Sequence, residues 1–210
     1  MRTKLIAAGL VLTLGFMAHG CSQKTRYVTQ SEQQSTQESK ENITMGLDNA
    51  DFQRAAQEAI QSMLESGAVD KPGGGRYVLA ISNIVNDTMQ RIDTDQLVKK
   101  IRVALLQSGK VVVTTAVSAG GPEDDMSYKA RELRKSEEFN QKTVAKKGQM
   151  VAPDLSLSGK IIQRNSTLQD GSQRSDYYFQ LSLTDINSGL AFWEGETVIG
   201  KVGSNDSAAW

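Results

Sequence analysis

Two alternating segments near the C-terminus place the strongest constraint on the fold of this chain. Residues 177–186 read YYFQLSLTDI, and residues 190–202 read LAFWEGETVIGKV. Between them stands Asn187-Ser188-Gly189, which is typical of a tight hairpin turn. Residues 155–163 alternate in the same way, after which residues 165–176 are rich in turn formers. Since a period of two marks a strand with one buried face, the last third is predicted to be an antiparallel meander. The residues expected to point inward are Leu155, Leu157, Ile161 or Ile162, Phe179, Leu181 and Leu183.

The preceding segments change between helical and strand patterns. Apolar residues recur at helical spacing in two segments, and two runs of β-branched residues read as strands. The predicted elements are a helix over 52–64, capped by Asp48 or Asn49 and ended by Gly67, a strand over 77–85, a helix over about 93–108 and a strand from 111. Together with the meander they predict an α+β fold, a small antiparallel or mixed sheet flanked by helices.

Residues 119–150 depart from this pattern because they carry dense charge of both signs. A Gly-Pro loop, a helix near 124–135 and a second helix near 137–147 are predicted there. Met126, Ala130 and Leu133 would give the first helix a narrow apolar stripe. Charge runs are usually solvated faces, but this one is also the largest addition to a minimal α/β unit. It is therefore a candidate partner surface.

The N-terminal residues have the pattern of an export signal. Arg2 and Lys4 precede the uncharged run 5–17, which is shorter than the ~20 residues that cross a bilayer. Ala18-His19-Gly20-Cys21 follows and resembles a lipobox, the site at which a bacterial lipoprotein is lipidated on cysteine. The alternatives are a single spanning anchor, or ordinary cleavage that leaves a free thiol. The predicted organisation is a signal peptide over 1–20, a lipid anchor and polar tether over 21–45 and one globular domain over 46–210.

The predicted mature chain has few means of catalysis. His19 is the only histidine and Cys21 the only cysteine, so catalytic triads, Cys/His zinc sites and structural disulfides are all excluded. No catalytic residue, metal site or cofactor is predicted. Carboxylate-only or Ser-Lys chemistry remains possible, and the enzymatic alternative is a cell-wall hydrolase that would use the carboxylates of Glu123, Asp124 and Asp125.

Charge and loop order exclude two further classes of ligand. The chain has 24 basic and 24 acidic residues, and removing Arg2 and Lys4 leaves 22 against 24, a net charge of −2. This is not the basic field that binds nucleic acid. The glycines 73–75 lie between a predicted helix and a following strand, which is the reverse of the order in a phosphate-binding loop.

The segment 22–45 is predicted to be a disordered tether, because it contains mostly Gln, Ser, Thr and Glu. Fully stretched, it would span roughly 80 Å at ~3.3–3.6 Å per residue. Relaxed, it would span nearer ~30 Å.

Four features that follow one another along the chain resemble those of the LpoB family, which consists of outer-membrane lipoproteins that activate penicillin-binding proteins. They are the lipobox-like sequence, the polar tether, a strand–helix unit and the last hairpin. In the strand–helix unit, Asn86-Asp87-Thr88 holds the place of the family's Asn-x-Thr, and Gly109 ends the helix. In the hairpin, Ser188-Gly189 is followed four residues on by Trp193, as in the family. The resemblance covers about 48–202 and is loose through 119–150.

The resemblance implies a fold like the N-terminal domain of the translocation protein TolB. It also implies a non-enzymatic regulator that binds a bifunctional class A penicillin-binding protein and stimulates glycan polymerisation and cross-linking. Ser22-Gln23 after the cysteine carries no acidic residue, which in enterobacterial-type sorting implies delivery to the outer membrane, facing the periplasm. The alternatives are a curli-secretion-type lipoprotein and an envelope-assembly adaptor with another partner.

The sequence suggests where such a partner would bind. Mixed charge can steer an encounter without a large apolar patch, so the folded domain is expected to bind through 119–150. The candidate partner-binding residues are Arg131, Arg134 and Lys135.

Overall fold

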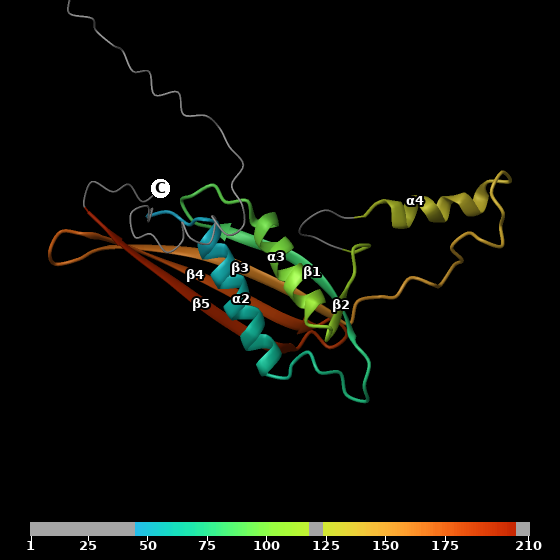
Figure 1. Ribbon diagram of the computed structural model, residues 1–210, viewed down its shortest axis with the longest axis horizontal. Coiled ribbons are helices and arrows are strands. Elements are labelled where there is room, and N and C mark those ends of the chain that lie inside the picture. Colours follow the sequence, from blue (N-terminus) through green and yellow to red (C-terminus); the bar gives the residue numbers. More distant parts are fainter. Residues whose placement is uncertain (1–44, 118–123, 205–210) are drawn as a thin grey trace, which may run out of the picture. The chain divides into compact units, whose positions relative to one another are not determined.

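The predicted meander forms most of one five-stranded sheet in the computed structural model, which describes residues 45–117 and 124–204 (Figure 1). Its strands lie in the order β2-β1-β3-β4-β5, and β3, β4 and β5 pair antiparallel. β1 pairs in parallel with both β2 and β3, so the sheet is mixed. The bounds are β1 Tyr77–Asp87, β2 Val111–Val113, β3 Leu155–Thr167, β4 Gln173–Asp185 and β5 Ala191–Gly203. The α+β prediction is confirmed.

Two helices lie across one face of this sheet, α2 (Asn49–Glu65) and α3 (Thr94–Gln107) (Figure 1). Both begin where the sequence predicts. The Asp48 side chain accepts from Ala50 N and Asp51 N at the start of α2, and Asp93 caps α3. Gly67 follows α2 and Gly109 follows α3, with φ of 75° and 70°. These left-handed conformations favour glycine and stop each helix.

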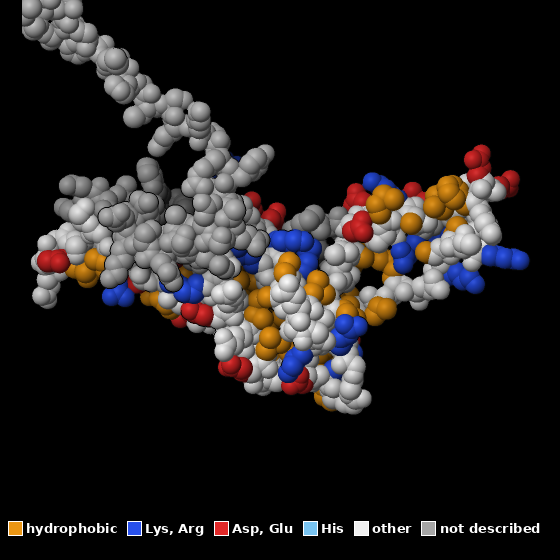
Figure 2. All heavy atoms as spheres, in the orientation of Figure 1, with side chains coloured by type: hydrophobic (Ala, Val, Ile, Leu, Met, Phe, Trp, Pro, Cys, Tyr) orange, Lys and Arg blue, Asp and Glu red, His pale blue; other side chains and the backbone are white. Residues whose placement is uncertain are grey.

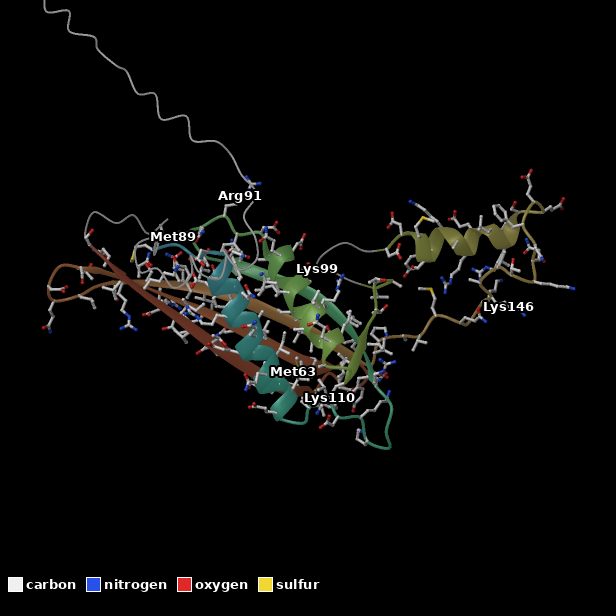
Figure 3. All side chains as sticks on the ribbon, viewed as in Figure 1. Met63, Met89, Arg91, Lys99, Lys110 and Lys146 are labelled. Atoms are coloured by element: carbon white, nitrogen blue, oxygen red, sulfur yellow. The ribbon has the colours of Figure 1, made fainter. Side chains whose placement is uncertain are left out.

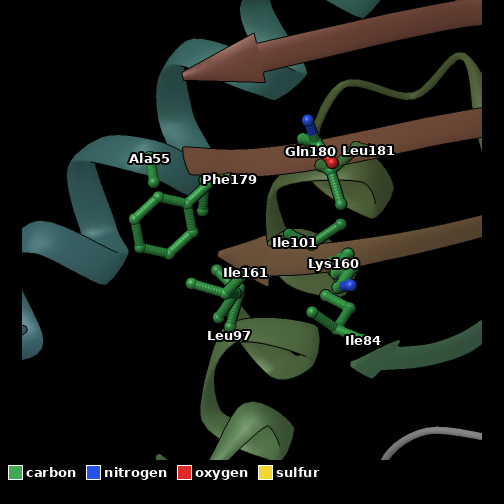
Figure 4. A pocket seen from close by; sticks show the side chains of 10 residues that line it. Ala55, Ile84, Leu97, Ile101, Lys160, Ile161, Phe179, Gln180 and Leu181 are labelled. Carbon is green, nitrogen blue, oxygen red and sulfur yellow. The ribbon is translucent and has the colours of Figure 1, made fainter. Parts of the chain in front are cut away.

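The core lies between the helices and the inward face of the sheet. The predicted inward residues of β3 and β4 are all buried, with Ile161 rather than Ile162 in the core. Phe52 of α2 meets Phe179 of β4 edge to face, with ring centroids 6.0 Å apart. Met63, near the C-terminal end of α2 (Figure 3), is also fully buried. The cavity beside Leu97, Ile161 and Phe179 has about 10 Å³, room for about one water at most, so it is no ligand site (Figure 4).

The inward face of the sheet carries a glycine on either side of Leu181. Gly159 of β3 and Gly195 of β5 are its two cross-strand partners. A Cβ on Gly159 would lie 2.5 Å from a Leu181 methyl carbon and 2.6 Å from Gln180 O, and the Trp193 ring covers Gly195. The two glycines thus leave room for the side chains of Leu181 and Trp193. A Cβ at either position would overlap with one of these side chains.

The hairpin between β3 and β4 is longer than the alternation predicts. The predicted turn over 165–176 shrinks to the residues between Thr167 and Gln173, because the polar ends of both strands pair. Leu168 N donates to Ser172 O and Gly171 N donates to Leu168 O, which closes the turn. Backbone pairing here does not need an apolar face, so the sequence pattern does not show it.

The helical predictions for 119–150 are partly wrong. The first helix is short, α4 (Met126–Glu132) with the 3-10 turn η2 (Leu133–Lys135), and its predicted apolar stripe buries nothing. The second helix, predicted near 137–147, does not form and is replaced by turns. Asn140 explains the turn, since its side chain accepts from Lys142 N and its carbonyl from Thr143 N. Such local bonds compete with a helix that has no apolar face to bury.

Some predicted features lie outside the described residues, namely the signal peptide over 1–20, Cys21, nearly all of the tether and Glu123. All described residues belong to one compact unit, Glu41–Trp210. Across 45–117 and 124–204, no helix is long and apolar enough to cross a membrane.

Candidate partner-binding surface

The segment 124–154, here called the charged segment, connects β2 to β3 and stays at the surface. Not one of its residues is buried; the next buried residue is Leu155, where β3 begins. It carries α4 and η2, and Figure 2 shows basic and hydrophobic side chains together on this part of the surface. The segment therefore has the exposure that a binding surface needs.

Both ends of the charged segment are tied to the rest of the domain, the start to the chain that follows β2 and the end to β1. At its start, Asp124 N donates to Thr115 O over 3.0 Å, and the Tyr128 hydroxyl donates to Ala116 O over 2.8 Å. At its end, Asp154 N donates to Val78 O over 2.7 Å. The Asp154 carboxylate accepts from Val78 N and from Lys71 Nζ, at 2.9 and 3.0 Å. The Val78 hydrogen bond, with help from Lys71, lowers the pKa of Asp154.

The structure brings the three predicted partner-binding residues together in one hollow of about 590 Å³, here called the basic hollow. Arg131 and Arg134 are partly fixed, since Arg131 Nη1 donates to Ser127 O and Arg134 Nε donates to Arg131 O over 2.9 Å. Lys135 makes no hydrogen bond or ion pair within the described part of the chain. The complete lining is Tyr128, Arg131, Glu132, Arg134, Lys135, Lys147 and Met150.

Sequence reasoning missed four members of this lining, Tyr128, Glu132, Lys147 and Met150. Helical spacing groups residues 131, 134 and 135, but it does not reach residues 147 and 150, which arrive from the turns after η2. Gln141 shapes those turns, because its side-chain amide donates to Leu133 O, Ser136 O and Phe139 O. No sequence signal marked this contact.

The carboxylates of the hydrolase alternative make only local contacts where they are described. Asp124 Oδ1 accepts from Met126 N over 3.0 Å, as at the start of a turn. Asp125 forms a surface ion pair with Lys129 at 3.4 Å. Within 45–117 and 124–204, no group of three His, Cys, Asp or Glu side chains could hold a metal ion. These contacts are typical of helix starts and solvated pairs.

A second polar cluster holds residues 45–48, here called the root, where the predicted tether would join the domain. Lys201 Nζ donates to Gly46 O over 2.6 Å and lies 2.5 Å from Asp51 Oδ2. The Tyr177 hydroxyl donates to Met45 O over 2.9 Å. Burial raises the pKa of this hydroxyl.

The loop after β1 holds the root from another direction. The Gln90 side-chain amide accepts from Leu47 N over 2.8 Å and donates to Leu47 O over 2.9 Å. A Cβ on Gly46 would lie 2.9 Å from Gln90 Oε1, so glycine lets the amide approach. The same loop leaves Met89 70% exposed beside Arg91 (Figure 3). The root is thus fixed by β4, β5 and this loop together.

Comparison with known protein families places the chain among the non-enzymatic regulators of peptidoglycan synthesis. Residues 51–199, well over half of the chain, match the model of the peptidoglycan-synthase activator LpoB. The chain belongs to the LpoB family, as the resemblance implied. A comparison with curated protein sequences finds no match.

Similar solved structures include members of the same family. The LpoB C-terminal domain from Salmonella enterica is 16% identical, with a TM-score of 0.43, covering 71% of this chain and 98% of that domain. LpoB from Escherichia coli, in a structure determined by NMR, is 12% identical, with a TM-score of 0.40, covering 96% of this chain and 87% of that chain. Lipoprotein GNA1162 from Neisseria meningitidis is 16% identical, with a TM-score of 0.33 and coverages of 63% and 88%. The family assignment rests on the sequence match.

Proposed function

We propose that this chain is an outer-membrane lipoprotein that binds and stimulates a bifunctional class A penicillin-binding protein. The match of residues 51–199 to the activator family carries the proposal. The sequence before the domain supports the location, because a basic start, an apolar run and Cys21 form a lipoprotein-type export signal. Lipidation of Cys21 would hold the domain at the membrane without a spanning helix.

The partner would meet the folded domain at the charged segment. Arg131, Arg134 and Lys135 share one hollow there, and none of the three is committed to an ion pair within the described residues. Exposed cations of this kind attract an oppositely charged partner surface at long range and raise the rate of encounter. Activation would then follow from binding, with no reaction at the lipoprotein itself.

The test of function uses a soluble chain, Ser22–Trp210, added to the class A synthase of the same organism while lipid II polymerisation is followed. A saturable rise in rate is expected. A peptide of residues 22–44 is the matched control and should give no rise, because it lacks the domain. If the peptide stimulates as well as the chain, the domain is not the activating part. If the chain neither binds nor stimulates, the proposed function is wrong.

Charge reversal tests the surface. The triple variant Arg131→Glu, Arg134→Glu, Lys135→Glu should bind the synthase more weakly, and the loss should be larger at 50 mM than at 300 mM salt, because salt screens exposed charges. Titration of the labelled chain at both salt concentrations measures this. Unchanged affinity at both concentrations would show that the partner binds elsewhere.

A further inference from the structure

The charged segment is not held in its conformation by a core. From residue 124 to residue 154 no residue is buried as a whole, and α4 has only seven residues. Isolated helices shorter than ~12–15 residues are only marginally stable in water. The unfavourable free energy of nucleation is larger than the stabilisation from a few backbone hydrogen bonds. Packing of an apolar face normally supplies the difference, and α4 has no such packing. Its helical form therefore depends on local contacts, such as the Asp125–Lys129 ion pair and the Tyr128 hydroxyl bond to Ala116 O, and not on a buried face.

The contacts that the segment does make fix its ends and one turn. Tyr128 ties it to the chain after β2, Asp154 ties it to β1, and the Gln141 amide donates to three carbonyls around the turn after η2. Tyr128 is the one α4 side chain named among these contacts, and only its hydroxyl is held, since the side chain remains 47% exposed. Met126 remains 63% exposed and Phe139 49% exposed. These side chains leave apolar surface on the segment that a partner could cover.

The lining of the basic hollow indicates what completes it. Four cations, Arg131, Arg134, Lys135 and Lys147, outnumber the one carboxylate of Glu132. The two lysines have no hydrogen-bond or ion-pair partner within the described residues. The other walls are apolar, with Tyr128 47% exposed and Met150 37% exposed. A volume of about 590 Å³ lies within the ~300–1,000 Å³ that ligand pockets occupy.

We propose that the basic hollow binds an acidic peptide segment that carries a large apolar side chain, and that this segment stabilises the helical form of α4. Acidic side chains would pair with the lysines, and the apolar side chain would cover Tyr128 and Met150. The source of the peptide, a segment of the synthase, rests on the proposed function. The kind of peptide that the hollow binds follows from its lining alone.

Other anionic ligands fit the hollow less well. A membrane surface is flat, whereas the hollow is concave, and Glu132 would face its anionic headgroups. A peptidoglycan stem peptide offers carboxylates and methyl groups, but no large apolar side chain for Tyr128 and Met150. Like charges placed together are unfavourable, so Glu132 selects a ligand of mixed rather than uniform charge. A muropeptide and anionic vesicles therefore serve as comparison probes in the experiment.

The experiment measures binding of a fluorescent peptide of alternating Glu and Leu with one central Lys to the soluble chain Ser22–Trp210. Comparison probes are the same peptide with Ala for Leu, a muropeptide and anionic phospholipid vesicles. The Leu peptide should bind most tightly. Hydrogen exchange of amides 126–135 should slow when it is bound, since binding would stabilise α4. Tighter binding of muropeptide or vesicles, or no slowing of exchange, would overturn the proposal.

Variants locate the site. Lys135→Glu with Lys147→Glu should weaken the Leu peptide about tenfold at low salt, since two attractions become repulsions. Lys99→Glu with Lys100→Glu on α3 makes the same charge change and should have little effect. Met150→Ser should weaken the Leu peptide about threefold and leave the Ala peptide unchanged, because it removes only apolar contact. Equal effects from both lysine pairs would overturn the assignment to the hollow.

The two proposals fail separately. If the chain stimulates the synthase and the Lys135, Lys147 variant stimulates it equally, the function stands and the hollow is not its binding site. If the Leu peptide binds the hollow but the chain does not bind the synthase, the chemistry of the hollow stands and the partner must be another protein.

Discussion

Replacing Lys201 with methionine tests how the root of the folded unit is held. The Lys201 side chain is 6% exposed, and its ammonium contacts Asp51 at 2.5 Å and Gly46 O at 2.6 Å. Methionine keeps most of the apolar stem but has no ammonium group. The substitution therefore leaves a buried carboxylate and a buried carbonyl without their charged donor.

The expected loss follows from the contacts that remain. Removing one partner of a buried ion pair usually costs about 3–5 kcal/mol, because the other charge stays buried and unpaired. Asp51 keeps two donors, Asp48 N at 3.0 Å and Arg54 Nη2 at 3.2 Å, and the Arg54 side chain is 57% exposed. We therefore expect the lower end, a loss of about 3 kcal/mol in the free energy of unfolding. Urea denaturation of Ser22–Trp210, followed by circular dichroism, measures it.

A second variant tests whether the loss of stability comes from the Asp51 carboxylate that has lost Lys201. Lys201→Met with Asp51→Leu removes both charges, and well-packed apolar replacements of buried pairs are often neutral. The double variant should recover about 2 kcal/mol relative to Lys201→Met. It should remain about 1 kcal/mol below wild type, because Asp51 also accepts from the Asp48 amide in the capping box. If the double variant is no more stable than Lys201→Met, the unpaired carboxylate is not the cause and the reasoning is refuted.

Two further predictions concern the sheet. Gly159→Ala would place a methyl group 2.6 Å from Gln180 O, and we expect a loss of about 1–3 kcal/mol by urea denaturation; a neutral result would mean that β4 shifts freely. Asp154→Asn should lower stability by less than about 1 kcal/mol at neutral pH, because the side chain is partly exposed. The lowered pKa of Asp154 means that its stabilisation is present above the unfolded value near 3.8 and is lost as pH falls through the folded value. The gap between Asn and wild type should close in acid, and a gap that widens would contradict this sign.

The elements with strong local signals could be predicted from the sequence. Asp48, Asp93 and the glycines after α2 and α3 mark the helix ends, and alternation marks the inward face of β4. Capping and burial are decided by near neighbours, so they can be read from short stretches. The parallel pairing of β1 with β3 is decided by contacts about 75 residues apart in the chain, and no local pattern shows it.

Polar contacts between residues far apart in the chain could not be predicted from the sequence. Lys201 stands at an inward position of β5, where an apolar residue is expected, and only its contacts with Asp51 and Gly46 explain it. Ser175 is fully buried in the extended hairpin and donates to Asn165 Oδ1 over 3.0 Å. Buried polar groups need partners, but the sequence does not say which residues supply them.

The Asn-x-Thr motif behind the family resemblance finds a structural role at the root. Thr88 N donates to Asn86 Oδ1 over 3.1 Å, and Asn86 Nδ2 donates to Gln90 O over 2.9 Å. Both polar ends of the Asn86 side chain are thus used inside the loop. The motif sets the loop so that the Gln90 amide can pair with both backbone groups of Leu47. The motif therefore helps to fix the root, where the predicted tether enters the domain.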